Sequence, residues 1–166
     1  DSSRCLVRIT SNGGKTWSTV PLPQPQPRPG AAPLSYCAAS TPAVAYSADG
    51  RRLYAAYAYT DYSRQPGYFI SGVVISVSAN SGAKWSTPTI ALPEASIDGE
   101  AQPESYHAIR LATAPDDPWV YVVAKLPGLY GSALLFGKSS DRGLSWSEST
   151  IASGDRGDAS AVGDKA

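Results

Sequence analysis

The 166-residue sequence contains no methionine, one histidine and two cysteines, and each scarcity narrows what the chain can be. Because position 1 is Asp, we expect a processed chain or a piece of a longer one. Two cysteines and one histidine are a poor basis for a structural zinc site, and no phosphate-binding glycine loop or serine nucleophile elbow is present. We therefore expect neither a metal nor a cofactor.

Net charge and long apolar runs are also missing. Lys and Arg total 14 and Asp and Glu total 14, so no overall field favours nucleic acid or an anionic membrane. No run approaches the roughly 18 apolar residues of a membrane-spanning helix, and the first residues lack the layout of a signal peptide. We expect no nucleic-acid partner and no membrane span.

Helical periodicity is absent as well, and alternation with a period of two takes its place. Short runs rich in Val, Ile, Tyr and Ala are bounded by Gly, Pro, Asp and Ser, which predicts an all-β protein. One group of strands is expected at 43–46, 53–59, 73–77 and 89–92, and a second group at 108–112, 119–124, 134–136 and 150–152. An Asp49-Gly50 turn joins the first two strands as a hairpin. Each group is predicted to form a four-stranded antiparallel meander.

One eight-residue pattern occurs three times: a hydroxyl residue, any residue, Asn or Asp, any residue, Gly, two further residues and Trp. The three tryptophans lie 68 and 61 residues apart, which is the spacing of a structural repeat. We expect each copy to form the turn between a third and a fourth strand, with its Asn or Asp accepting backbone N–H groups and its Gly adopting positive φ. We expect each Trp to be buried between neighbouring units. The residues concerned are Asn12, Gly14, Trp17, Asn80, Gly82, Trp85, Asp141, Gly143 and Trp146.

These octets resemble the Asp-box, or BNR repeat, of the sialidase superfamily. The resemblance implies a β-propeller of about six blades, of which this chain would supply about two and a half. It implies the end of one blade and a proline-rich insertion at 1–30, a second blade at 31–93, a third at 94–153, and the lead-in to a further blade at 154–166. In that family the boxes lie on the face opposite the active site, so they imply fold and not catalysis.

Cys5 and Cys37 are the two cysteines, and their pairing would close a loop worth about 3 to 4 kcal/mol. A disulfide is one interpretation and two unpaired buried thiols the other. The family favours an exported protein, whether secreted, periplasmic or at the cell surface.

Candidate ligand-binding residues lie in the loops that would line the mouth of such a propeller, at about 60–72, 93–107 and 126–131. A carboxylate, an arginine and tyrosines on one mouth would suit a glycan. The candidates are Asp61, Arg64, Glu104, Tyr106, His107 and Arg110. Arg110 interrupts an apolar strand, where an unpaired charge is costly, so an ion pair with Glu104 or Asp61 is the structural alternative.

A tyrosine series, Tyr54, Tyr57 and Tyr59, alternates with alanines and is assigned to one sheet face as core or interblade packing.

Three functions remain open at this point. The first is a glycan- or protein-binding scaffold module, the second is a fragment of a sialidase-type glycoside hydrolase, and the third is a structural part of an extracellular assembly. The Arg-Ile-Pro segment that usually carries the first sialidase arginine is missing, so no catalytic residue is assigned. Because incomplete blades leave apolar faces open, we expect the chain to associate with further blades or with copies of itself.

Overall fold

The computed structural model describes residues 5–26, 35–36, 42–61, 69–97, 106–115, 118–128, 131–155 and 158–160. All regular structure in these ranges is β-strand, which confirms the all-β prediction. The strands are β1 (Leu6–Ile9), β2 (Ser18–Pro21), β3 (Ser35–Tyr36), β4 (Ala43–Tyr46), β5 (Leu53–Asp61), β6 (Phe69–Ser78), β7 (Thr89–Ile97), β8 (His107–Thr113), β9 (Val120–Gly128), β10 (Gly131–Ser139), β11 (Ser147–Asp155) and β12 (Asp158–Ser160).

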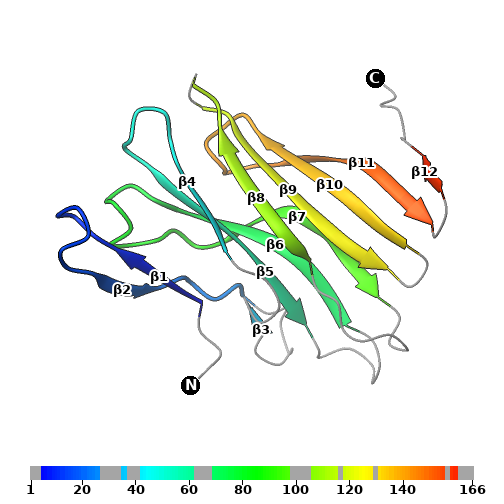
Figure 1. Ribbon diagram of the computed structural model, residues 1–166, viewed down its shortest axis with the longest axis horizontal. Coiled ribbons are helices and arrows are strands. Elements are labelled where there is room, and N and C mark those ends of the chain that lie inside the picture. The colour runs from blue at the N-terminus through cyan, green and yellow to red at the C-terminus, as the bar shows by residue number, and fades with distance from the viewer. Residues whose placement is uncertain are drawn as a thin grey trace.

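The strands form three antiparallel sheets (Figure 1). The first sheet pairs β1 with β2. The second contains β4, β5, β6 and β7 as a meander, with β3 also paired to β5. The third runs β8, β9, β10, β11 in chain order, and β12 pairs with the outer edge of β11. Both expected meanders are therefore present, and the short strands β3 and β12 were not predicted.

The second sheet lies between the other two and packs against a neighbouring sheet on each side. In Figure 1 the first sheet is at the left, the second in the middle and the third toward the upper right. One apolar cluster joins the second and third sheets and includes Ile75, Leu92 and Val122. Another, which includes Leu22 and Val74, joins the second sheet to the first. Each sheet is therefore stabilised mainly by apolar contacts with the sheets beside it.

Every residue of β5 is buried, and its side chains alternate between the two apolar clusters. Tyr54 lies in the cluster shared with the third sheet, whereas Tyr57 and Tyr59 lie in the cluster shared with the first. The sequence prediction that all three tyrosines share one face is therefore wrong, because Tyr54 is separated from Tyr57 by an odd number of positions. Their assignment to the packed interior is right: each is at most 3% exposed.

The Tyr57 hydroxyl shows how tightly the first and second sheets fit together. It donates to the carbonyl of Pro23 at 2.6 Å and lies 2.9 Å from Oγ of Ser76. A polar atom that is buried with its partners made holds two surfaces in one relative position.

The same contact recurs where each sheet meets the one before it. A Cβ built on Gly82 would collide with Ile9 of β1, and one built on Gly143 would lie 3.6 Å from Val77 of β6. Ile9 and Val77 are equivalent positions, since each immediately precedes the hydroxyl residue of its box. The turn of each following sheet is therefore seated on the third strand of the preceding one in the same way.

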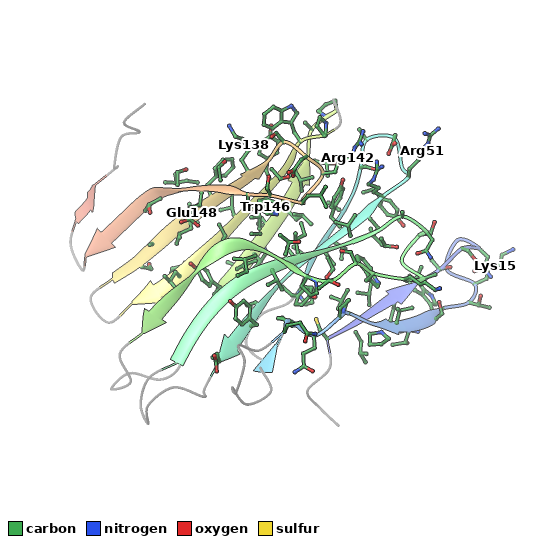
Figure 2. The ribbon with its side chains drawn as sticks, turned by 180° about the vertical axis from the view of Figure 1, so that it is seen from behind. Lys15, Arg51, Lys138, Arg142, Trp146 and Glu148 are labelled. Atoms are coloured by element: carbon green, nitrogen blue, oxygen red, sulfur yellow. The ribbon has the colours of Figure 1, made fainter. Side chains whose placement is uncertain are left out.

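The two ends of the sheets differ in what they carry. All three box turns lie at one end together with the hairpin at Ser47–Gly50, and Figure 2 shows Lys15, Arg51 and Arg142 on turns at that end. Because the strands are antiparallel, Asp61 at the end of β5 and His107 at the start of β8 lie at the other end. The described strand ends that flank the candidate ligand-binding loops therefore lie at the end opposite the boxes.

Candidate functional site

The third box turn is a closed hydrogen-bond network around one carboxylate. Ser139 donates from Oγ to Oδ1 of Asp141 at 2.8 Å and accepts from the backbone N–H of Gly143 at 2.7 Å. Oδ1 of Asp141 also accepts the backbone N–H groups of Leu144 at 3.0 Å and Ser145 at 2.9 Å, and Oδ2 accepts the Ser145 hydroxyl. These bonds, led by the one from the Ser145 hydroxyl, lower the pKa of Asp141 to about 2.

The first box keeps this frame with a carboxamide in place of the carboxylate. Asn12 accepts from the backbone N–H of Thr16 at 2.9 Å and donates from Nδ2 to the Thr16 hydroxyl at 2.8 Å. Thr10 accepts from the N–H of Gly14 at 2.9 Å. An amide can both accept and donate, so replacing Asp by Asn preserves the turn without a charge.

The second box lacks the last hydroxyl, because Lys84 stands where the other copies have Thr or Ser. The Lys84 backbone N–H still donates to Oδ1 of Asn80 at 2.8 Å, and Gly82 donates to Oγ of Ser78 at 2.8 Å. The backbone therefore holds the turn even where one side chain has changed.

Two successive positive φ angles shape each box. The glycines have φ of +88°, +86° and +86° at Gly14, Gly82 and Gly143, as the sequence predicts. The preceding residue also has positive φ, and in two boxes it is not glycine: Ser81 at +56° and Arg142 at +65°. A side chain in this region costs about 1 kcal/mol, which the box hydrogen bonds offset. Sequence reasoning missed this second position.

The three tryptophans differ in burial, contrary to the expectation that all are buried between units. Trp85 packs against the cluster of the first and second sheets and Trp146 against that of the second and third, whereas Trp17 is 50% exposed. Its ring lies 5.5 Å from the guanidinium carbon of Arg8. No described sheet precedes the first one, so Trp17 has no apolar surface to cover it.

The indole N–H groups divide the three tryptophans differently. Trp17 and Trp146 donate to the carbonyls of Gly14 at 3.0 Å and Gly143 at 3.2 Å. Nε1 of Trp85 is buried and has no hydrogen-bond partner among the described residues. The box hydroxyl, Asn or Asp and Gly groups named above form hydrogen bonds that shape the turns.

At the opposite end, the structure makes Tyr106 an interior residue. It is 0% exposed, its backbone N–H donates to Oγ of Ser71 at 3.2 Å, and Ser71 donates to the carbonyl of Tyr59 at 3.1 Å. Burial, and to a lesser extent the charge of Glu148, raises the pKa of the Tyr106 phenol well above its usual value. Tyr106 therefore joins the second and third sheets and offers no surface to a ligand.

Asp61 and Arg110 lie on neighbouring sheets but in different environments. Asp61 is 5% exposed at the end of β5. Arg110 is exposed, and its Nη1 donates to the carbonyl of Ile109 at 3.0 Å. No ion pair joins Arg110 to Asp61 in the described part of the chain. The sequence placed Arg110 in an apolar strand where an unpaired charge is costly, but its side chain is exposed to solvent.

The remaining ligand-site candidates are only partly described. His107 is the first residue of β8, while Glu104 and Arg64 lie outside the described residues. Beside His107, Ala108 has φ of +52° within a bulge where β8 departs from regular pairing with β9. Non-glycine residues are held in this conformation only by their surroundings. The start of β8 is therefore a strained segment next to exposed Arg110.

A hollow of about 700 Å³ at the box end was not anticipated from the sequence. It lies between the first and second sheets, and its lining includes Ile9, Trp17, Val20, Tyr46 and Asn80. Tyr46 is 56% exposed on β4, and the neighbouring Val44 is 53% exposed. On the third sheet, β8 packs against β4 of the second sheet, and Oγ1 of Thr113 donates to the carbonyl of Tyr46 at 2.7 Å. Among the described residues the first sheet has no corresponding strand, and the hollow lies at this place.

Several other features can be stated for the described residues alone. Cys5 is disulfide-bonded and buried; the other cysteine of the sequence, Cys37, lies outside the described residues, so a Cys5–Cys37 pairing stays a prediction. Within the same ranges, no group of three His, Cys, Asp or Glu side chains could hold a metal ion. Nor do those residues contain a helix that could span a membrane.

Comparison with known proteins adds no relative: no protein-family model, curated protein or solved structure matches the chain.

Proposed function

We propose that this chain is part of a sialidase-like β-propeller that serves as a scaffold for binding a glycan or a protein. The observation that carries the proposal is the repeated seat of each box glycine on the preceding sheet, Gly82 on Ile9 and Gly143 on Val77. Neighbouring sheets related by a constant contact generate a regular array, and propeller blades are arrays of this kind. The box spacing and the meander order within each sheet support the same architecture.

Recognition is assigned to the end opposite the box turns. The hydroxyl and the Asn or Asp of each box form hydrogen bonds within their own turn, whereas the other end carries the exposed Arg110 beside a strained strand start. Guanidinium groups bind carboxylates and hydroxyl-rich ligands through several directed N–H donors. A glycan that bears a carboxylate is therefore the ligand class that best fits this end.

Binding to immobilised glycans tests this proposal. We expect the protein to bind at least one acidic oligosaccharide, such as 3′-sialyllactose, and Arg110→Ala to weaken binding about tenfold, the usual loss for a charge-assisted contact. The matched control is Arg51→Ala, an exposed arginine at the box end, which should bind as the unaltered protein does. Equal losses in both variants, or no binding to any acidic glycan, would refute recognition at this end.

The Asp-box resemblance favours a second candidate, a piece of a sialidase-type hydrolase with most catalytic residues outside this chain. Hydrolysis of a fluorogenic sialoside by the protein would establish that candidate. Binding without turnover would support the scaffold role instead.

We also place the protein in an oxidising compartment, as a secreted, periplasmic or surface protein. The support is the disulfide at Cys5, since such bonds persist mainly outside the cytosol. Labelling of free thiols in freshly isolated, unreduced protein should find none.

A further inference from the structure

The face of the third sheet that points away from the second sheet is called here its outward face. Residues on this face are equivalent in sequence to residues that are buried in the second sheet. Counting 61 residues along the chain, the spacing of Trp85 and Trp146, relates Val73 to Leu134 and Ile75 to Phe136. Val73 is 0% and Ile75 1% exposed, because the third sheet covers them. Leu134 is 36% exposed and Phe136 is half-buried. The outward face of the third sheet therefore resembles the face of the second sheet on which the third sheet packs.

The outward face of the first sheet points away from the second sheet. It carries the equivalents of the residues with which the second and third sheets pack on the sheets before them. Leu6 is equivalent to Val74 and to Leu135, which are 2% and 9% exposed and pack against the sheet before them. Leu6 itself is 54% exposed, and Trp17, whose equivalents Trp85 and Trp146 pack against the preceding sheet, is 50% exposed. These are the positions with which a sheet docks onto its predecessor.

The box glycines differ in the same way between the first sheet and the other two. Gly82 and Gly143 are seated on third-strand side chains of the preceding sheet, but a Cβ on Gly14 would meet only Trp17 within 4 Å. Position 138, where the second sheet has Val77, carries an exposed lysine. Lys138, labelled in Figure 2, lies on the same face of β10 as Leu134 and Phe136, because these positions are two residues apart. Its Nζ lies 5.4 Å from the ring centre of Trp119.

We propose that these two faces bind each other between copies of the chain, with the first sheet of one copy docked on the third sheet of the next. In this arrangement Gly14 and Trp17 of one copy are seated on Phe136 and the Lys138 stem of its neighbour. The inference rests on the proposed propeller architecture, because it treats the contact between copies as a third instance of the sheet-to-sheet contact within the chain.

A second copy fits these faces better than an unrelated partner, because each face is the counterpart of the other. A head-to-tail contact of this kind uses two different surfaces, so it leads to a closed ring or an open chain of copies rather than a twofold dimer. The formal net charge of zero sets up no overall repulsion between copies.

The test blocks one face at a time with a carboxylate. Leu134→Glu alters only the outward face of the third sheet, and Leu6→Glu only that of the first; both sites are exposed, so folding should be preserved. Val44→Glu is the matched control, an exposed apolar residue that lies on neither outward face. Masses are measured by analytical ultracentrifugation from micromolar to near-millimolar protein, with circular dichroism to check the fold.

We expect the unaltered protein and Val44→Glu to increase in mass with concentration. Leu134→Glu and Leu6→Glu should each stay monomeric alone, with association at least about tenfold weaker. Mixed together, they should form a one-to-one dimer, because each retains the face that the other needs.

Three results would overturn the proposal: a monomeric unaltered protein throughout the range, association of all three variants alike, or failure of the two blocked variants to combine. Glycan binding by the same samples is read separately, so a loss of association without a loss of binding leaves the proposed recognition function standing.

Discussion

Removing one hydroxyl from a box turn should cost more where the turn is buried than where it is exposed. Ser139 is 1% exposed and its bond with the N–H of Gly143 is buried, while Thr10 makes the equivalent bond with Gly14 in exposed surroundings. In Ser139→Ala the Gly143 N–H loses its acceptor at 2.7 Å and water cannot replace it. We expect a loss of about 1–3 kcal/mol in the free energy of unfolding.

Thr10→Val provides the matched comparison, since it removes the hydroxyl and keeps the branched shape. Water can satisfy the exposed Gly14 N–H, so the expected loss is about 0.5–1 kcal/mol. Ser78→Ala, at a site with 0% exposure, should resemble Ser139→Ala.

Urea unfolding followed by tryptophan fluorescence at fixed low protein concentration measures all three losses. Thermal unfolding gives a second reading at about 2–4 °C per kcal/mol for a chain of this size. Equal losses at all three sites, or a larger loss in Thr10→Val, would refute the argument that burial makes these turns strong.

Three further predictions concern charge, close packing and the indole N–H groups. The pKa of Asp141 is about 2 against an ordinary 3.8, so its contribution to stability is complete above pH 3.8 and is lost as the pH falls through about 2. Asp141→Asn should therefore show a weaker loss of stability than the unaltered protein in urea titrations between pH 5 and 2; parallel curves would contradict the assignment. A Cβ at Gly137 would lie 2.8 Å from the carbonyl oxygen of Ala91, so Gly137→Ala should cost about 1–3 kcal/mol, and an unchanged melting temperature would show that the sheets are not this close. Trp146→Phe loses a hydrogen bond that Trp85→Phe does not, so it should be the more destabilising by about 1 kcal/mol; the reverse order in urea unfolding would count against the observed indole contacts.

Much of the fold was predictable because its signals are local. The Asp49-Gly50 pair indicates a turn, and Gly50 has φ of +69° in the hairpin between β4 and β5. The box hydroxyls, Asn or Asp and Gly likewise specify turns by hydrogen bonds that span at most four residues. Strand order followed from these turns, since an antiparallel meander needs only short connections.

What the sequence did not reveal depends on contacts between sheets. The opposite orientation of Tyr54 and Tyr57 follows from their odd separation along the strand, but the burial of both faces of β5 depends on the neighbouring sheets, and such a strand shows no polar alternation in the sequence. The exposure of Trp17 likewise depends on which sheets surround it. Its turn is the same as that of the two packed tryptophans, so the turn does not predict the difference.

The candidate ligand site was less predictable than the fold. Arg110 and Tyr106 both appeared as mouth residues in the sequence, yet one is exposed and the other fully buried. The difference arises from the bulge at Ala108, which changes the pairing of β8 just after Tyr106. Bulges of this kind carry no reliable signal in a single sequence.

The claim on which the other conclusions depend is that the three sheets are related by one constant step. Spin labels at Lys15, Ala83 and Leu144, three exposed residues at the same position of the three boxes, measure that step by pulsed electron spin resonance. The account predicts equal distances for the pairs 15–83 and 83–144, and a 15–144 distance shorter than their sum because the steps turn about an axis. Clearly unequal steps, or three labels on a straight line, would contradict it.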